Sequence, residues 1–301
     1  MSDLKLKDLR YLVALADTRH FGKAAAKCFV SQPTLSAQLK KLEDYLGCAL
    51  IERQPKNVTL TETGERVVER ARRMLIDSDE IVELVRQSRD PLSGTLRLAL
   101  IPTIGPYLLP LVTAKIRKAL PRLKLMLYEH QTAPLLERLR AGELDIGIVA
   151  LPVHLDGLAS RTLYDEPFTV ALPAKHPLAD HATVKLQDLA GEKLLLLEDG
   201  HCLRDQALEL CGRVGLHEGD DYRATSLETL RQMVAAGHGV TLLPGLAAAA
   251  AHGDQRSLAI RPFAKPVPKR VVGAVWRKSS ARSAVIEALC QVIAQTMHRK
   301  R

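Results

Sequence analysis

The spacing of hydrophobic residues changes once along this chain of 301 residues, and that change decides which folds it can adopt. Up to residue 88 the apolar residues recur every three or four positions, which predicts helices. From Thr95 onward short apolar runs alternate with helical segments, a pattern typical of βαβ units around a mostly parallel sheet. The polar stretch 88–94 contains Pro91 and Gly94 and is interpreted as a linker. We therefore expect an all-α amino-terminal domain followed by an α/β region.

The first sixty residues predict three helices with a tight turn before the third. Helical spacing covers 4–17 and 21–27, and Ser31 is suited to cap a third helix that has Pro33 in its first turn. This is the helix-turn-helix arrangement, whose last helix enters the major groove of DNA. Its first turn exposes short polar side chains suited to bases and phosphates. A generic helical bundle is the alternative.

Residues 62–88 predict one long amphipathic helix with a narrow apolar stripe. The stripe follows heptad spacing and consists of Val67, Ala71, Met74, Ser78, Ile81 and Val85. Two such helices from two chains would pair and hold two DNA-reading units about one helical turn of DNA or more apart. A helix packed on its own domain is the alternative.

The α/β region predicts two lobes joined by two crossings. The last strand, 271–276, and a closing helix, 281–297, are expected to return to the first lobe. The crossings are expected near 163–167 and 262–268, and a small-molecule cleft is expected at the strand ends between the lobes. The predicted domains are 1–60, 61–92 and 93–301, with lobe I at about 93–164 and 267–301 and lobe II at about 165–266.

One cysteine of this region occupies a position that should activate it. Asp199 or Gly200 can cap a helix that begins there, and Cys202 then lies in its first turn. The positive end of the helix dipole, with His201 and Arg204 alongside, should favour the thiolate, which is the reactive form.

A second cysteine follows nine positions later, at Cys211. A continuous helix would separate the two residues by about 13.5 Å along its axis, whereas a disulfide needs Cα atoms within about 7 Å. A disulfide between them would therefore force the helix to unravel, as in a redox switch. Two small core residues are the alternative, and a metal site is disfavoured by the spacing.

The composition favours a reducing, intracellular setting. The chain has no apolar run of eighteen residues and no signal-peptide core, so we expect a cytoplasmic protein without a membrane segment. Five cysteines, an odd number, do not resemble a secreted disulfide framework. The net charge is +9, but residues 261–301 have a balance of +9 and residues 1–90 only +2, so net charge alone would place a nucleic-acid contact at the wrong end.

The amino-terminal sixty residues resemble the winged helix-turn-helix of LysR-type transcriptional regulators. The similar segments are 24–25, 30–36, 41–43, 46–47, 50–53, 60–61 and 63–64. In that family the recognition helix contacts DNA through positions held here by Gln32, Pro33, Thr34 and Ser36, and the wing through Arg53 and Lys56. A position that often reads bases is Ala37 here, so we expect a narrower contact set. The family also has a two-lobed effector domain similar to periplasmic solute-binding proteins.

The effector region is similar to that of the peroxide-sensing members of the family. The similar segments are 101–110, 131–132, 198–207 with Cys211, 223–231, 233–237 and 241–244. The resemblance implies that peroxide oxidises Cys202 and that Cys211 resolves the sulfenic acid into an intramolecular disulfide. It also implies that Thr103 and Thr132 hold peroxide, that His201 helps to position it, and that Arg270 favours the thiolate. The register of Arg270 is open because Lys269 is its neighbour. The remaining cysteines, Cys28, Cys48 and Cys290, are interpreted as structural.

The implied function is a DNA-binding transcription regulator, mainly an activator, of the oxidative stress response, without enzymatic activity, cofactor or metal. The implied partners are promoter DNA, RNA polymerase, hydrogen peroxide as effector, a thiol reductant of the glutaredoxin or thioredoxin type, and further copies of the chain in a homodimer that assembles into a homotetramer. One alternative is a LysR-type regulator that binds an organic metabolite in its cleft, whose response would survive Cys202→Ser. The other is a thiol peroxidase, which would show sustained turnover with a reductant.

Overall fold

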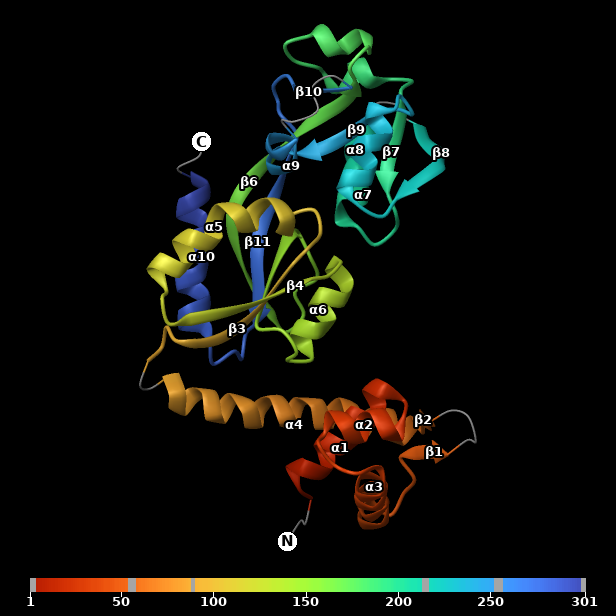
Figure 1. The fold of residues 1–301 in the computed structure, drawn as a ribbon, viewed down its shortest axis with the longest axis vertical. Helices are drawn as coiled ribbons and strands as arrows, with labels where there is room; N and C mark the ends of the chain where they lie inside the picture. Colours follow the sequence, from red (N-terminus) through yellow and green to blue (C-terminus); the bar gives the residue numbers. More distant parts are fainter. Residues whose placement is uncertain (1–3, 54–57, 88–89, 213–216, 252–256, 299–301) are drawn as a thin grey trace. The chain divides into compact units, whose positions relative to one another are not determined.

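The computed structural model describes residues 4–53, 58–87, 90–212, 217–251 and 257–298 (Figure 1). The chain forms two compact units, residues 1–89 and 90–301, and each is described by itself. No helix within the described ranges is both long enough and apolar enough to cross a membrane. The predicted wing residue Lys56 lies outside these ranges.

The first unit is a winged helix-turn-helix with a long helix after it. Its elements are α1 (Leu6–Thr18), α2 (Phe21–Lys27), α3 (Gln32–Leu46), the antiparallel strands β1 (Ile51–Arg53) and β2 (Val58–Leu60), and α4 (Glu62–Gln87). The predicted cap of α3 is confirmed, because the Ser31 hydroxyl accepts a hydrogen bond from the backbone N–H of Thr34 at 3.3 Å. Leucines of α1 and α3 fill the core, and the Glu43 carboxylate accepts hydrogen bonds from Leu50 and Ile51, which fixes the wing on α3.

The apolar stripe of α4 has two parts. Ala71 is buried within the first unit, and α1 packs along the helix, where Asp17 pairs with Arg72 and Arg10 pairs with Asp79. Met74, Ile81 and Val85 are exposed. The alternative of a helix packed on its own domain therefore holds for part of the stripe, and Met74, Ile81 and Val85 form an exposed apolar face from the middle of α4 towards its end.

The second unit is built on a seven-stranded sheet. Its strands are β3 (Gly94–Leu100), β4 (Leu123–Glu129), β5 (Ile146–Leu151), β6 (Leu158–Pro173), β9 (Thr241–Pro244), β10 (Leu258–Pro262) and β11 (Lys269–Arg277). The strand order is β10-β6-β11-β5-β3-β4, with β9 also on β6. Among the described pairs of this sheet, only β3 with β4 and β3 with β5 are parallel, so the prediction of a mostly parallel sheet is wrong. The returning strand β11 runs antiparallel to both β5 and β6.

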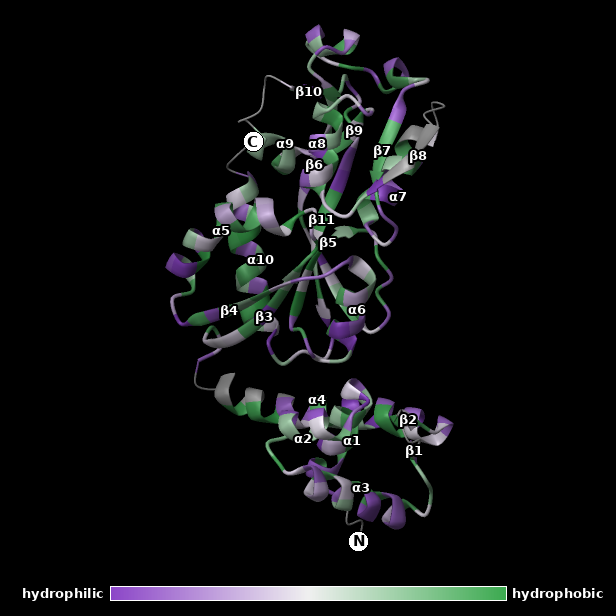
Figure 2. Ribbon diagram, turned by 45° about the vertical axis from the view of Figure 1, so that its right-hand side comes forward, coloured by the Kyte–Doolittle hydropathy of each residue, from purple (hydrophilic) through white to green (hydrophobic). Residues whose placement is uncertain are grey.

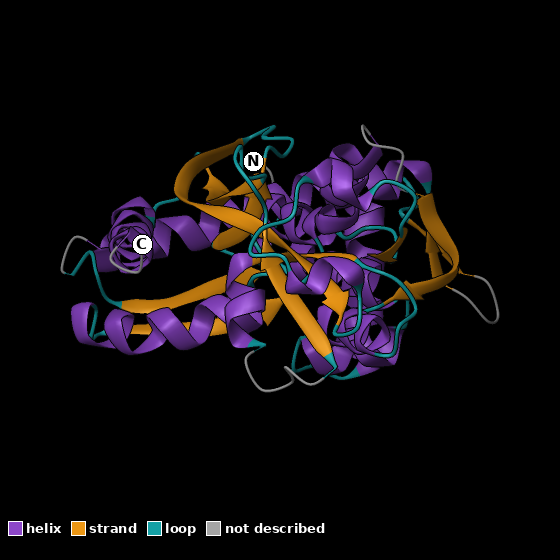
Figure 3. Cartoon of the chain, turned by 90° about the horizontal axis from the view of Figure 1, so that it is seen from above, coloured by secondary structure: helices purple, strands orange, loops and turns teal. Residues whose placement is uncertain are grey.

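Lobe I contains β3, β4, β5, β11 and the first part of β6. Its helices are α5 (Gly105–Ala119), α6 (Thr132–Arg140) and α10 (Ser283–His298). Helices α5 and α10 lie on one side of the sheet and α6 on the other, so the strands run between helices (Figure 1). Figure 3 gives the distribution of helix, strand and loop along the chain in a view from above. The strands of this layer are largely hydrophobic, whereas the outer turns of the helices carry polar residues (Figure 2).

Lobe II is joined to lobe I through β6, which belongs to both lobes. It pairs with β11 as far as Pro167 and with β9 and β10 from Phe168 onward. The second crossing lies between Pro262 and Lys269. The other elements of lobe II are η1 (Pro177–Asp180), η2 (Leu186–Leu189), β7 (Lys193–Leu197), α7 (Cys202–Cys211), β8 (His217–Ala224), α8 (Leu227–Ala235) and α9 (Gly245–Ala250).

Candidate functional site

Two predicted peroxide-binding threonines follow neighbouring parallel strands. Thr103 comes after β3, just before α5, and Thr132 opens α6 after β4. Because β3 is parallel to β4 and β5, the carboxyl ends of all three strands meet at one edge of the sheet. The side chain of Thr103 is buried there, and so is the hydroxyl of Thr132.

Helix α7 brings Cys202 to this edge from the other lobe. Leu203 and Ala207 on the same helix pack in the core of lobe II, whereas Cys202 packs against the core of lobe I. The thiol also interacts with the Thr132 hydroxyl and with a backbone group of Ala150 on β5. Cys202 therefore lies where the two lobes contact each other.

The start of α7 differs from the prediction by one or two residues. The N-cap is His201 rather than Asp199 or Gly200, and its side chain makes no capping hydrogen bond. Gly200 has a φ of +92°, and a Cβ there would lie 2.7 Å from Oε1 of Gln131. Glycine is thus required by the backbone conformation and by the close approach of the segment before α6.

The expected activation of Cys202 by its sequence neighbours is not found. Arg204 pairs with Asp199, with Nε 2.9 Å from Oδ1, and burial lowers the pKa of His201, which favours the neutral imidazole. Burial also raises the pKa of the Cys202 thiol, and the largest opposing influence is the positive charge of Arg270, followed by the hydroxyl of Thr132. Burial therefore works against the thiolate, and the residue that opposes burial most strongly, Arg270, comes from β11 rather than from the helix start.

Arg270 is the basic residue at the site, and Lys269 is not. The Arg270 side chain is 1% exposed, whereas Lys269 is exposed and pairs with Asp165 at 2.5 Å. Nη1 of Arg270 donates to Oγ1 of Thr103 at 3.0 Å, and Nη2 donates to the backbone carbonyl of Thr103, also at 3.0 Å. Nε donates to Oε2 of Glu166 at 2.8 Å. The structure thus brings together Thr103, Thr132, Cys202 and Arg270.

The sequence reasoning missed one residue of the site and one buried polar residue on the helix that carries Cys202. Glu166 pairs with Arg270 across β6 and β11, 104 positions away, and no local pattern predicts such a partner. Gln206 lies four positions after Cys202, on the same face of α7, and its Oε1 is buried without a hydrogen-bond partner among the described residues. Helical spacing from Cys202 could have selected Gln206.

Thr132 combines two properties that suit a ligand-binding hydroxyl. It has no hydrogen-bond partner of normal geometry among the residues described, yet it lies near enough to the Cys202 sulfur to lower the pKa of that thiol. The sulfur contact is the weaker kind of hydrogen bond, so the hydroxyl keeps capacity for another partner. A small polar molecule beside the thiol would find a donor and acceptor there.

The predicted resolving cysteine, Cys211, lies at the far end of α7. The ten-residue helix runs from Cys202 to Cys211, and nine steps of rise separate the residues by about 13.5 Å. The side chain of Cys211 lies outside the described part of the structure. Since a disulfide needs Cα atoms within about 7 Å, this helix must open before the two cysteines can bond.

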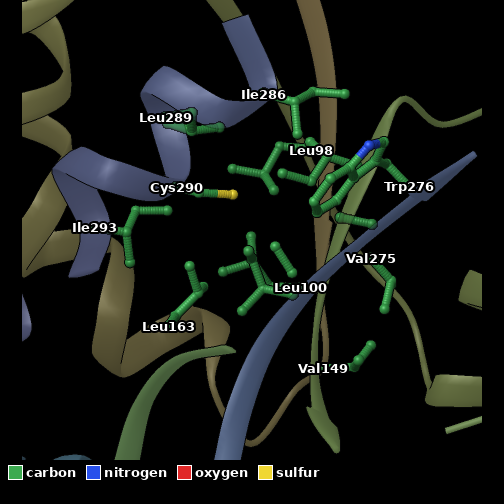
Figure 4. Packing of buried hydrophobic residues seen from close by; sticks show 14 of the residues in the cluster. Leu98, Leu100, Val149, Leu163, Val275, Trp276, Ile286, Leu289, Cys290 and Ile293 are labelled. Carbon is green, nitrogen blue, oxygen red and sulfur yellow. The ribbon is translucent and has the colours of Figure 1, made fainter. Parts of the chain in front are cut away.

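The remaining cysteines differ in exposure. Cys290 on α10 is fully buried, and its sulfur points into a cluster that includes Leu98, Leu100 and Ile293 (Figure 4). Burial raises the pKa of this thiol to about 12. Cys28 follows α2 and is half-buried. Cys48 follows α3 and is exposed, so the interpretation of it as a structural residue in a helix or a core is wrong.

The predicted DNA-reading residues lie on the outer side of α3. Gln32, Pro33 and Thr34 are exposed and Ser36 is half-exposed, whereas Leu35 between them is buried. The hydroxyls of Thr34 and Ser31 lie 2.7 Å apart, which holds the first turn. Arg53 ends β1, and its side chain, like Lys56, is outside the described part.

Within the described residues, no group of three or more His, Cys, Asp or Glu side chains is placed to hold a metal ion.

Comparisons with known proteins identify the family. Residues 6–65 match the model of the bacterial regulatory helix-turn-helix proteins of the lysR family, and residues 89–298 match the model of the LysR substrate binding domain. The chain is a LysR-family protein. The prediction of the family and of the fold class, a winged helix-turn-helix followed by a two-lobed α/β domain, is therefore confirmed.

The individual proteins to which this LysR-family chain is similar include several named OxyR. It is 45% identical over 294 residues, covering 98% of this chain and 96% of the relative, to the DNA-binding transcriptional dual regulator OxyR of Escherichia coli K12. It is 41% identical to a full-length OxyR cysteine-to-aspartate mutant from Pseudomonas aeruginosa, with a TM-score of 0.79 and coverage of 96% of this chain and 97% of that one. It is 35% identical to a hydrogen peroxide-bound OxyR cysteine mutant from Corynebacterium glutamicum, with a TM-score of 0.68 and coverage of 98% and 93%.

Proposed function

We propose that this chain is a DNA-binding transcription regulator that senses hydrogen peroxide through Cys202 and Cys211. The observation that carries the proposal is the meeting of a shielded thiol with two hydroxyls and one buried guanidinium, at Cys202, Thr103, Thr132 and Arg270. Hydroxyls bind a small uncharged oxidant, and the positive charge favours the thiolate. The names of the relatives, which include OxyR, support the same function.

The proposed chemistry has two steps that balance. The Cys202 thiolate attacks one oxygen of hydrogen peroxide, so that an S–O bond forms as the O–O bond breaks, and the released hydroxide takes up a proton to give water. The thiol of Cys211 then displaces the hydroxyl of the sulfenic acid as a second water, which leaves a disulfide. A dithiol reductant of the glutaredoxin or thioredoxin type would return both sulfurs to thiols.

The disulfide is proposed to act on DNA through a change of structure. Because α7 must open, Cys202 must leave its contact with the core of lobe I, and the lobes lose one link. We propose that paired chains, joined through the exposed apolar face of α4 and assembled into tetramers, then present their recognition helices at a different spacing. This change would alter the contacts with promoter DNA and RNA polymerase.

The decisive experiment combines peptide mapping with footprinting. The reduced full-length chain is exposed briefly to near-stoichiometric hydrogen peroxide, and the same samples are mapped without reductant and footprinted on DNA selected by the protein from a random pool. A Cys202–Cys211 disulfide that appears with a changed footprint supports the proposal, and Cys202→Ser should abolish both. An unchanged footprint after oxidation would favour a regulator with an organic effector, and sustained turnover of peroxide would favour an enzyme.

The DNA-reading face has a matched pair of variants on one helix. Gln32 is exposed in the first turn of α3, and Gln38 lies further along the same helix. We expect Gln32→Ala to weaken binding to the selected DNA by about 1–3 kcal/mol, the usual value of a good base contact. Gln38→Ala is the control and should change affinity little. Equal losses of DNA affinity in the two variants would contradict the proposal that the first turn of α3 contacts the bases.

A further inference from the structure

Glu166 is a buried carboxylate that the proposed chemistry does not yet use. Its side chain is 2% exposed, and it lies on β6 opposite Arg270 on β11. Oε2 accepts a hydrogen bond from Nε of Arg270 at 2.8 Å, and Oε1 accepts one from the backbone N–H of Leu246 at 2.9 Å. Leu246 is in the first turn of α9. One carboxylate therefore holds both the guanidinium of the site and the start of a helix in lobe II.

The position of Arg270 decides what the Thr103 hydroxyl can do. Arg270 donates to the hydroxyl oxygen and to the carbonyl of Thr103, both at 3.0 Å. A guanidinium only donates, so it occupies a lone pair of Oγ1 and leaves the hydroxyl proton available. That proton can then be donated to another molecule. With Arg270 fixed on two atoms of one residue, Thr103 is set up as a hydrogen-bond donor.

We propose that Glu166 is a positioning residue for the peroxide reaction, because it holds Arg270 on Thr103 and so keeps the Thr103 proton directed at the oxidant. As Cys202 forms its S–O bond, negative charge develops on the departing oxygen, and a fixed hydroxyl donor stabilises that charge before the oxygen is protonated to water. Glu166 also keeps the guanidinium from swinging onto the Cys202 thiolate as a direct ion pair. This inference rests on the proposed function.

The test compares two reactions of the same sulfur. Reduced full-length protein reacts either with hydrogen peroxide or with iodoacetamide over a range of pH, and modification of the Cys202 peptide is followed by mass spectrometry. Iodoacetamide needs only the thiolate, whereas peroxide also needs stabilisation of its leaving oxygen. Glu166→Gln should lower the ratio of the peroxide rate to the iodoacetamide rate at least tenfold. The alkylation profile should stay in place or move to lower pH as Arg270 is released.

Two further variants make the result specific. Asp165→Asn is the matched control, because this neighbour on β6 pairs with Lys269 at the surface. It should leave the ratio within twofold of the unaltered chain. Glu166→Asp keeps the charge and so protects folding, but it is one methylene shorter and cannot hold both partners. It should lower the ratio severalfold.

The outcomes separate this inference from the function on which it rests. If Cys202 of the unaltered chain fails to react with near-stoichiometric peroxide, both are overturned. If the unaltered chain reacts but Glu166→Gln and Glu166→Asp keep its ratio within twofold, only the role of Glu166 is overturned. Parallel slowing of both reactions would point to a loss of structure rather than of positioning, and would also count against the inference.

Discussion

At the scale of single residues, the burial that shields Cys202 also works against its ionisation. Burial raises the pKa of the thiol, while Arg270 and Thr132 act in the opposite direction. The thiolate fraction at neutral pH is therefore smaller than for a free cysteine, and the rate of oxidation should rise with pH through and above the ordinary thiol range. The reactivity of this residue depends on the few groups that partly offset burial.

The substitution Thr132→Val tests how much the Thr132 hydroxyl offsets burial of Cys202, because valine has nearly the same shape as threonine. Loss of the hydroxyl removes an interaction that lowers the pKa of Cys202, so the pKa should rise further. A hydrogen bond of about 1–1.5 kcal/mol corresponds to a decrease in peroxide reactivity of about tenfold at neutral pH. Rate measurements over pH check this. Thr113→Val, on α5, is the control and should leave the rate unchanged.

Cys290 offers a stability prediction with a defined sign. Its pKa is raised from 9.0 to about 12 by burial, so the folded chain keeps this thiol protonated more tightly than the unfolded chain does. The associated stabilisation is complete below pH about 9 and is lost as pH rises towards about 12. Urea unfolding between these pH values should show a decline that is smaller in Cys290→Ala. In native protein at neutral pH, a thiol reagent should label Cys48 and leave Cys290 unmodified.

At the scale of elements, α7 belongs to lobe II but begins at lobe I. Its apolar face lies in the core of lobe II, and its first residue contacts lobe I. The turn before it depends on Gly200, which combines a positive φ with the close approach of Gln131. The position of the reactive sulfur is therefore set by the backbone that precedes the helix.

A matched pair of substitutions, Gly200→Ala and Gly157→Ala, separates the effect of backbone strain from the effect of the contact between residue 200 and Gln131. Both glycines have positive φ, but a Cβ at Gly157 meets no atom within 4 Å. Each substitution should reduce the free energy of unfolding by about 1 kcal/mol. Only Gly200→Ala should also displace Gln131 and slow oxidation of Cys202 severalfold. Equal oxidation rates in the two variants would show that the segment before α7 does not position the sulfur.

At the scale of the whole molecule, the two units have separate hydrophobic cores. The core of the first unit is formed by α1 to α4 and the wing, while residues 90–301 contain both lobe cores. A fragment of residues 90–301 should therefore fold alone, with a cooperative thermal transition. Its Cys202 should react with peroxide within about threefold of the full chain, and it should not bind the selected DNA. Calorimetry and the peptide mapping described above check these expectations, and a molten fragment would contradict them.

The parts of the structure that follow local rules could be predicted from the sequence. The cap at Ser31 and the span of α4 depend on residues within a few positions of one another, and the structure agrees with both. The direction of β11 does not depend on its own residues, so a mostly parallel sheet was expected in error. Thr103, Thr132 and Arg270 were selected only through the resemblance to a family, whereas Cys202 was also selected by its position at the start of a predicted helix.

The environment of the site depends on distant partners and could not be predicted. Arg204 was expected to activate Cys202 because it is close in sequence, but it pairs with Asp199. Glu166 reaches Arg270 only because β6 and β11 lie side by side. Burial has the largest effect on the pKa of Cys202, and burial is a property of the assembled lobes.

The ten-residue length of α7 also delays disulfide formation, and this delay sets an upper limit on the peroxide concentration to which the protein can respond reversibly. On the proposed mechanism, a sulfenic acid formed at Cys202 waits for the helix to open before Cys211 can capture it. During that wait a second peroxide molecule can oxidise it to the sulfinic acid, which is irreversible without dedicated repair. Below the peroxide concentration at which the second oxidation keeps pace with helix opening, each molecule can be reset and used again. Above that concentration, the same exposure inactivates it permanently.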